Sequence, residues 1–327
     1  MSTEIIKPGL LTTLVGCERK GFRNIGIGSG GAMDRVAMRV ANYLVGNNDN
    51  AAVMELHLPA PEILFKQSYL VSITGKGFEV LVNGVAVPRW RPIRVTKNAA
   101  MSFDIKSSGG RGYLSVKGGW RAQDWLGSFS THLGVQMGGY VGRALRKGDL
   151  LEAEEESGGE KDGIKFPWAI SENELDRIYF PPNEIRCVKS IETDLLSNES
   201  KEIVTSQFFT ITHQSNRMGY RLAGEPLYLS QRMDMASSPV DFGTIQLLPD
   251  GNLIILMADH QTAGGYPRIG SVIKADLPKL AQLGVNGKVA FKMISLAEAE
   301  LLLLSMEKQL DEIKSSCLQQ ISRYSIK

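Results

Sequence analysis

Short apolar runs broken by glycine and other turn-forming residues dominate the hydrophobic pattern of this 327-residue chain. Runs of this length, bounded in this way, are typical of β-strands. The 34 glycines are scattered along the sequence, as a chain with many tight turns requires. Strands are expected in the first half at residues 63–65, 69–74, 79–82, 93–96, 101–105 and 113–116, and in the second half at residues 185–188, 208–212, 244–248 and 253–257.

Two turn signals fix how some of these strands connect. Asn83-Gly84 stands between two apolar runs and predicts a hairpin with a type I′ turn, because both central residues of that turn need positive φ. Pro249-Asp-Gly251 predicts the turn between the last two strands.

Helix-type periodicity is confined to three places. Asp34 is expected to cap a helix that carries an apolar residue every four positions and ends before Gly46. A short helix is expected at residues 277–283, with Asp276 as its cap. A long helix is expected from Ser295, where Glu298 completes a capping box, to about residue 321. Its apolar stripe should pack on the chain's own sheet and consists of Leu303, Met306, Leu310, Ile313, Cys317 and Ile321.

Residues 152–163 are charged, rich in glycine and without periodicity, which indicates an exposed linker. The chain is also too long for one comfortable core. We therefore expect a mainly β fold with a few helices, in two domains. Residues 1–158 form an N-terminal β-rich domain, and residues 164–327 form a C-terminal β-rich domain that ends in the long helix.

Composition excludes several functional classes. The chain is 43% hydrophobic and 22% charged, as soluble globular proteins are. Its net charge of +2 argues against a nucleic-acid footprint and gives no reason to propose a membrane surface. The N-terminus lacks the pattern of a signal peptide, and the longest apolar runs are too short to span a bilayer. Three widely spaced cysteines, Cys17, Cys187 and Cys317, favour reduced thiols in the cytoplasm.

Residues 26–31 match the G-x-G-x-x-G pattern of dinucleotide-binding loops, but the context does not fit. No apolar strand precedes them, and the chain does not alternate strands with helices as a parallel sheet would. A weaker hypothesis survives: the backbone N–H groups of the loop Gly28, Ser29, Gly30 and Gly31, with nearby Arg19 and Arg23, could hold an anion. The four histidines share no ligand spacing, so no metal site is expected.

Polar and charged groups concentrate in three glycine-rich segments, at residues 128–146, 213–222 and 257–270. In the third, an apolar strand delivers Asp259, His260, Gln261 and Thr262 in succession, and Tyr266 and Arg268 follow a Gly-Gly pair. This set could bind an amide, with Asp259 as general base and Arg268 holding a carboxylate or oxyanion. Ordinary turn chemistry at a strand end explains the same pattern about equally well.

These segments resemble the family of 5-oxoprolinase C subunits, also called KipA-type proteins or allophanate hydrolase subunit 2. The family is similar to part of the carboxyltransferase domain of urea carboxylase. The stretches that carry the resemblance occur in the expected order and cover most of residues 9 to 290; they lie at residues 9–13, 31–34, 127–131, 138–145, 217–222, 243–246 and 257–267.

The resemblance implies two cyclophilin-like domains and a complex with two other proteins, the KipI-type B subunit and the A subunit of 5-oxoprolinase. That complex would couple ATP to the opening of 5-oxoproline to glutamate. The alternatives are a carboxyltransferase that passes a carboxyl group from carboxybiotin to urea or another ureide, and a KipA-type regulatory binding protein. The candidate catalytic residues are Asp259, His260 and Gln261. The candidate substrate-binding residues are Arg143, Arg217, Tyr220, Arg221, Gln246, Thr262, Tyr266 and Arg268.

The sequence departs from the family pattern at three places. Val15-Gly16 stands where relatives commonly have Gln-Asp, and Gly28-Ser29 stands where they have two prolines. Relatives often place a glutamate near Ser238. The two missing acids bear on the substrate, and the loss of the prolines should loosen the glycine loop.

Overall fold

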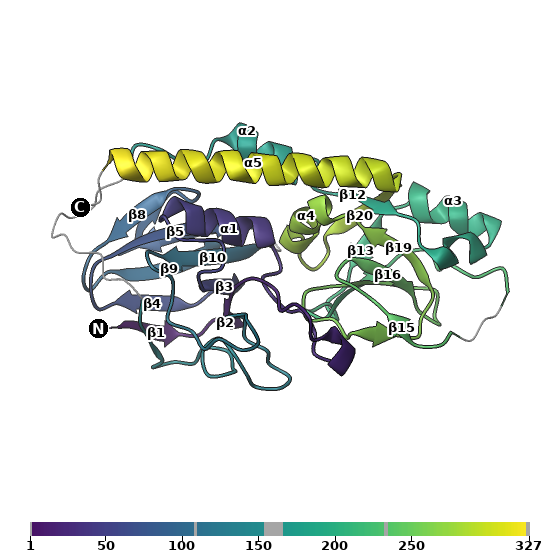
Figure 1. Ribbon diagram of the computed structural model, residues 1–327, viewed down its shortest axis with the longest axis horizontal. Helices are drawn as coiled ribbons and strands as arrows, with labels where there is room; N and C mark the ends of the chain where they lie inside the picture. Colours follow the sequence, from purple (N-terminus) through teal and green to yellow (C-terminus); the bar gives the residue numbers. More distant parts are fainter. Residues whose placement is uncertain (1, 108–109, 154–165, 232–234, 325–327) are drawn as a thin grey trace. The chain divides into compact units, whose positions relative to one another are not determined.

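The computed structural model describes residues 2–107, 110–153, 166–231 and 235–324. The chain forms two compact units. Unit 1 comprises Met1–Glu18, Asp34–Glu172 and Lys308–Lys327, and unit 2 comprises Arg19–Met33 and Asn173–Glu307. Both are built mainly from β-strands, so the predicted fold class is confirmed (Figure 1).

The division of the chain differs from the two continuous domains expected at residues 1–158 and 164–327. Residues 19–33 leave unit 1 because Met33 is fully buried in the hydrophobic core of unit 2. The last helix crosses from unit 2 to unit 1 between Glu307 and Lys308. Neither the exchange of residues 19–33 nor the division of the last helix between the units can be seen in a local hydrophobic pattern. Most of the expected linker lies outside the described residues.

Unit 1 contains two antiparallel sheets. The six-stranded sheet has the order β11 (Leu150–Leu151), β1 (Thr3–Lys7), β4 (Glu62–Phe65), β9 (Ala100–Ile105), β6 (Phe78–Val82) and β7 (Val85–Val87). The five-stranded sheet has the order β2 (Thr12–Val15), β3 (Val53–His57), β10 (Arg111–Val116), β5 (Tyr69–Gly75) and β8 (Pro92–Val95). The hairpin predicted at Asn83-Gly84 joins β6 to β7, with φ of 52° and 77° at the two residues.

Helix α1 (Arg35–Leu44) covers the five-stranded sheet of unit 1 (Figure 1). Asp34 caps it as predicted, since its carboxylate accepts a hydrogen bond from Ala37 N at 2.8 Å. Ser72 and Thr74 of β5 donate their hydroxyls to helix carbonyls at Ala41 and Ala37. These bonds satisfy polar groups that would otherwise be buried without partners.

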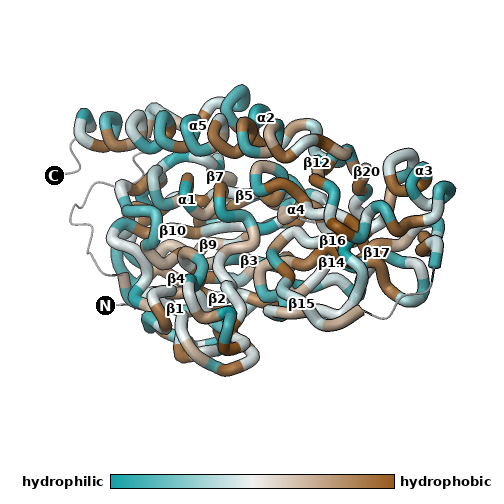
Figure 2. Tube along the Cα trace, turned by 45° about the vertical axis from the view of Figure 1, so that its right-hand side comes forward, coloured by the Kyte–Doolittle hydropathy of each residue, from teal (hydrophilic) through white to brown (hydrophobic). Residues whose placement is uncertain are grey.

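Unit 2 is built around a closed barrel with the strand order β12 (Glu184–Val188), β19 (Arg268–Val272), β16 (Thr244–Leu247), β17 (Leu253–Leu256), β14 (Gly219–Ala223), β13 (Phe209–Ile211) and β20 (Lys288–Met293). Its apolar side chains alternate toward the barrel core, and hydrophobic residues mark several of its strands (Figure 2). β15 (Ser238–Pro239) and β18 (Ala263–Gly264) form a separate two-stranded sheet. The short 3-10 turns are Arg23–Ile25, Ile191–Leu195 and Lys274–Asp276.

The helices of unit 2 include α2 (Glu172–Tyr179), α3 (Asn198–Ser206) and α4 (Leu277–Gln282), the last of which was expected at residues 277–283. Asp276 occupies the N-cap position of α4 as predicted, but its side chain makes no cap hydrogen bond. The carboxylate instead accepts from Arg186 N, Nε and Nη2 at 2.7, 2.9 and 2.6 Å, and Lys279 Nζ lies 3.1 Å away. Two nearby cations compete more strongly for a buried carboxylate than a backbone N–H does.

The long helix α5 (Leu296–Arg323) follows its predicted course, and Glu298 N donates to Ser295 Oγ at its start. Figure 2 shows hydrophilic and hydrophobic residues alternating along it. Leu310, Ile313 and Cys317 of the predicted apolar stripe are buried in unit 1, which confirms that this part of the stripe packs on the chain itself, whereas Leu303, Met306 and Ile321 are half-buried. Among the described helices, none is long and apolar enough to cross a bilayer.

Asp276→Ala should destabilise unit 2 by about 3–5 kcal/mol, because Arg186 and the buried Lys279 would lose their shared anion. The measurement is the shift of the urea unfolding midpoint. Asp194→Ala is the matched control, since the Lys189–Asp194 pair is largely exposed and should contribute about 0–1 kcal/mol. Equal midpoint shifts for the two variants would contradict the assignment.

Candidate functional site

A buried ion pair between Arg217 and Asp259 forms a polar centre of unit 2. Arg217 Nε and Nη2 donate to the two carboxylate oxygens at 2.7 and 2.9 Å. Nη2 also donates to the carbonyl oxygen of Gly31 at 2.8 Å. Only 6% of the Arg217 side chain is exposed, so this pair is shielded from water. One guanidinium thus joins the glycine loop, the residues before β14 and the loop after β17.

From the sequence alone, pairing at the surface is the commoner fate for Arg217 and Arg221. Arg217 is paired, but it is buried rather than at the surface. The physical cause is the backbone contact at Arg217, where Asp259 N donates to the Arg217 carbonyl at 2.8 Å. This backbone bond brings the two side chains together from positions 42 residues apart.

The glycine loop at residues 28–31 packs against the Asp259–His260 segment. A Cβ at Gly28 would lie 3.1 Å from the carbonyl oxygen of His260, so a side chain there would require the two segments to shift apart by a few tenths of an ångström. A Cβ at Gly30 would lie 2.7 Å from Arg19 Nη1 and 3.9 Å from Asp259 Oδ1. The anion that this loop meets in the structure is therefore the chain's own Asp259 carboxylate. Binding of an external anion here stays a prediction.

His260 is 2% exposed and sits between a carbonyl and a carboxylate. Its Nδ1 lies 2.5 Å from the carbonyl oxygen of Gln261, so Nδ1 carries the proton in the neutral ring. Nε2 lies 3.8 Å from Asp241 Oδ1 and has no hydrogen-bond partner in the part of the chain that is described. Burial lowers the pKa of His260 below its usual value, despite the opposing effect of the Gln261 carbonyl.

A cavity of about 480 Å³ opens on the outer face of the barrel, beside this centre. Alternation along β14 turns Tyr220 and Leu222 into the core and Gly219 and Arg221 outward. Arg221 pairs with Ile254 of β17, and Ile254 pairs with Gln246 of β16, so these three residues form one outward row. The cavity is lined by that row, the turn after β16 and the two polar loops, through Gln214, Asn216, Met218, Gly219, Arg221, Gln246, Leu248, Pro249, Asp250, Ile254, Gln261 and Tyr266.

Gln246 lines this cavity with one half of its amide uncommitted. Its Nε2 donates to the carbonyl oxygen of Tyr266 at 3.3 Å, which fixes which end of the amide is oxygen. Its Oε1 is buried and has no donor among the described residues. Because an unsatisfied buried acceptor costs about 1–3 kcal/mol, a donor brought to this atom would be favoured. Gly264 lies close to the amide: a Cβ there would be 2.7 Å from Nε2.

The structure brings together part of the predicted site. Arg221, Gln246, Gln261 and Tyr266 line one cavity, and Arg217, Asp259 and His260 form the buried centre behind the same loop. Thr262 contributes its carbonyl oxygen, which accepts from Val240 N. The phenol of Tyr220 is directed to the Leu283 carbonyl from within the core, so this residue does not line the cavity.

Two predicted arginines are held elsewhere by carboxylates. Arg268 donates to both oxygens of Glu192 at 3.1 and 2.7 Å. Arg143 belongs to unit 1 and donates to both oxygens of Asp149 at 2.7 and 2.8 Å. Mutual charge-assisted bonds raise the pKa of Arg143 and lower that of Asp149.

Sequence reasoning missed several residues of this site. Gln214 and Asn216 stood in the second polar segment but were not selected, because they lie in the turn between β13 and β14, where no strand or helix periodicity marks a common face. Asp250 was treated only as a turn residue, and it also lines the cavity. Asp241, which faces His260, has no local signal, because the two are joined only by the fold.

Two of the sequence departures can now be placed. Ser238 pairs with Gly264 across β15 and β18, so the position near which relatives often have a glutamate borders the candidate loop of unit 2. Gly16 belongs to unit 1, where a Cβ would lie 3.3 Å from both Asn50 Oδ1 and Phe129 Cβ. A larger residue at this position would need those neighbours to shift.

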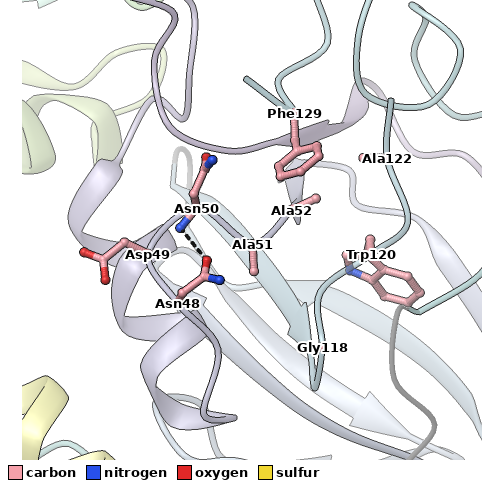
Figure 3. A pocket seen from close by; sticks show the side chains of 9 residues that line it. All are labelled: Asn48, Asp49, Asn50, Ala51, Ala52, Gly118, Trp120, Ala122 and Phe129. Carbon is pink, nitrogen blue, oxygen red and sulfur yellow. Dashed lines mark hydrogen bonds between the residues drawn. The ribbon is translucent and has the colours of Figure 1, made fainter. Parts of the chain in front are cut away.

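Unit 1 has a cavity of about 530 Å³ with a different character. Its walls include Trp120 and Phe129, and the hydrogen bond from Asn50 N to Asn48 Oδ1 is drawn in Figure 3. Asp49 is bonded to Arg39, Tyr43 and Lys314, and Trp120 Nε1 donates to Leu114 O. The charged group and the indole N–H of this cavity are therefore engaged within the chain. In the described residues, no group of three or more His, Cys, Asp or Glu side chains is placed to hold a metal ion.

Comparison with known proteins links this architecture to one family. Residues 25–293 match the family described as carboxyltransferase domain, subdomain A and B. The proteins named as the C subunit of 5-oxoprolinase in Haemophilus influenzae and Escherichia coli are each 35% identical to this chain, over 90% of its length and 92% of theirs. The crystal structure of Kluyveromyces lactis urea carboxylase superposes with a TM-score of 0.86 at 26% identity, covering 97% of this chain and 29% of that one.

Asp259→Ala should lower the stability of unit 2 by about 3 kcal/mol, because it leaves the Arg217 guanidinium buried without its anion. Asp259→Asn is the matched variant. It keeps an oxygen that can accept a hydrogen bond from Arg217, so it should lower the stability of unit 2 by clearly less than Asp259→Ala does. Urea unfolding midpoints of the three proteins make the comparison. Indistinguishable midpoints for wild type and Asp259→Ala would show that the pair does not hold the loop.

Stability should also fall as pH drops below about 6.5, the ordinary pKa of histidine, toward the lowered pKa of folded His260. In that window the unfolded chain binds a proton that the folded chain excludes, so protonation favours unfolding. Unfolding midpoints between pH 7.5 and 5 measure the slope. His260→Asn should flatten the slope, whereas the same change at the exposed His213 should leave it in place. A slope that survives in His260→Asn would assign it to other groups.

Proposed function

This chain belongs to the carboxyltransferase domain family, subdomains A and B, and we propose that it is the C subunit of an ATP-dependent 5-oxoprolinase. The complete enzyme would open 5-oxoproline to glutamate. The observation that carries the proposal is the similarity to two proteins named as this component of 5-oxoprolinase, which extends over 92% of their length. Similarity over nearly the whole chain supports the proposal that this protein fills the same position in a 5-oxoprolinase complex.

The proposed complex contains a KipI-type B subunit and an A subunit beside this chain. ATP enters the reaction through the complex, because this sequence has no glycine-lysine phosphate-binding motif. The glycine loop at residues 28–31, which resembles a phosphate-binding loop in sequence, packs against Arg19 and the chain's own Asp259 carboxylate. The three thiols are unpaired, which supports the prediction of a reducing, cytoplasmic location.

The geometry supports different roles for the three candidate catalytic residues. Asp259 is held by Arg217, and His260 is fixed by the carbonyl of Gln261, so both support the loop rather than project from it. Gln261 lies at the cavity, where its amide can meet a substrate. We assign Asp259 and His260 as positioning residues and Gln261 as the residue of the three that contacts the substrate.

Carboxyl transfer from carboxybiotin to urea or another ureide is the second candidate, and the similarity to the urea carboxylase structure favours it. Both reactions require recognition of a planar amide group, which the polar cavity of unit 2 can offer. The biotin carrier and its carboxylase would come from other chains. A KipA-type regulatory binding role is the third candidate, and it requires no turnover.

The test is reconstitution of this chain with the A and B components of 5-oxoprolinase. We expect glutamate and ADP to appear together, only when 5-oxoproline is supplied and only when all three proteins are present. Gln261→Ala should reduce kcat/KM by about 10-fold or more, since it removes a substrate hydrogen bond without touching the fold. Glutamate and ADP are measured in the same samples.

Omission of each protein in turn is the control. A folded complex that releases no glutamate, but carboxylates urea when a biotinylated carrier is added, would replace the first proposal with the second. Tight assembly without either reaction would favour the regulatory role.

A further inference from the structure

We infer that the outer-face cavity of unit 2 binds a small amide that carries a carboxylate, with Arg221 holding the carboxylate and the Gln261 side chain pairing with the amide edge. The inference rests on the proposed function for the reaction itself, and it names the chemical class of ligand that this site selects. Such a site would bind a lactam that carries a carboxylate more tightly than a simple ureide, which has none.

Arg221 is the cation that is available in the cavity. Its guanidinium makes neither an ion pair nor a hydrogen bond with any other residue the structure describes, whereas Arg217, Arg268 and Arg143 are each held by both oxygens of a carboxylate. The anion that lines the same cavity, Asp250, accepts from Asn252 N at 3.0 Å and from Asn252 Nδ2 at 2.9 Å. These bonds, and to a smaller degree the charge of Arg221, lower the pKa of the Asp250 carboxyl. A guanidinium fixed on a strand and facing a cavity matches a carboxylate by its paired donors.

The rest of the polar lining consists of carboxamides. Gln214, Asn216, Gln246 and Gln261 all reach the cavity. A free carboxamide presents a donor and an acceptor in one plane, which is complementary to a cis amide whose N–H and C=O lie on the same edge. Two of the four are partly engaged, since Gln246 Nε2 donates to Tyr266 O and Asn216 Oδ1 accepts from Met218 N. A lactam has this geometry by its ring. The lining therefore fits a neutral amide group better than a second charge.

Gln261 is the best placed of these carboxamides to pair with that edge. The hydrogen bond of His260 to its carbonyl fixes the backbone, and its side chain makes no hydrogen bond within the described residues. Gln246, on the strand beneath, adds a buried carbonyl oxygen that still lacks a donor in the described part of the chain. The cavity thus combines the Arg221 cation of β14, the free oxygen of Gln246 on β16 and the uncommitted Gln261 amide of the loop after β17.

A ureide such as urea has the amide edge but no carboxylate, so Arg221 would contribute little to its binding. A carboxylated lactam uses both parts of the lining. The site as built consequently favours the carboxylated amide, and the preference should depend on one side chain that no other part of the described fold requires.

The experiment measures dissociation constants by ligand-observed NMR for 5-oxoproline and for 2-pyrrolidinone, the same lactam without the carboxylate. The full chain is used alone and in the complex. Wild type should prefer 5-oxoproline by about 10- to 100-fold, and Arg221→Gln should reduce the preference to about 1. Arg177→Gln is the matched control: it removes the same charge from an exposed helix of unit 2 and should keep the preference.

A second ligand pair tests the amide edge. Wild type should bind 5-oxoproline more tightly than its N-methyl derivative, and Gln261→Ala should narrow that difference. Unfolding midpoints equal to wild type confirm that both variants fold. The inference is overturned if Arg221→Gln keeps the carboxylate preference, if Arg177→Gln abolishes it equally, or if neither chain nor complex shows saturable binding.

The kinetics separate this inference from the proposed function. Turnover of 5-oxoproline with an unchanged KM in Arg221→Gln would leave the 5-oxoprolinase proposal standing. It would contradict the inference that Arg221 binds the carboxylate in this cavity. Carboxylate preference that depends on Arg221, without turnover in the complete complex, would support the site and overturn the proposed reaction.

Discussion

The ion pair between Arg217 and Asp259 is the interaction on which the polar site of unit 2 depends. Three segments that are distant in sequence meet at one guanidinium: the glycine loop through Gly31 O, the chain before β14, and the loop after β17. A buried guanidinium is strongly directional, and removing its anion leaves a charge that water cannot reach. The pair therefore holds the start of the loop after β17, and with it the neighbouring residues His260 and Gln261.

The barrel supplies the second constraint. Its strands alternate, so the side chains that fill the core cannot also face the cavity. Tyr220 packs inside, while Arg221, the next residue, is turned outward. Gln246 is placed on the same outward row through its pairing with Ile254. The cavity is thus a product of strand register, and the loop after β17 closes one side of it with Gln261 and Tyr266.

The two cavities differ in whether their polar side chains are already bonded to other residues of the chain. In unit 1, Asp49 binds three side chains of the chain itself and Trp120 bonds to the backbone, so few polar groups face outward for a ligand. In unit 2, Arg221 and the side chain of Gln261 are not engaged in the described structure, and Gln246 keeps an unused oxygen. Uncommitted polar groups in a concave site are the property that ligand recognition requires.

The sequence by itself determined what depends on neighbours along the chain: the hairpin at Asn83-Gly84, the Asp34 cap, the stripe of α5 and most strands. It also located the polar segments. Only the tertiary structure decided which polar groups are free, because Asp276, Arg217 and Arg268 each find partners dozens of residues away. Local patterns report backbone preference and burial, whereas the pairing of charges depends on distances that only the complete fold sets.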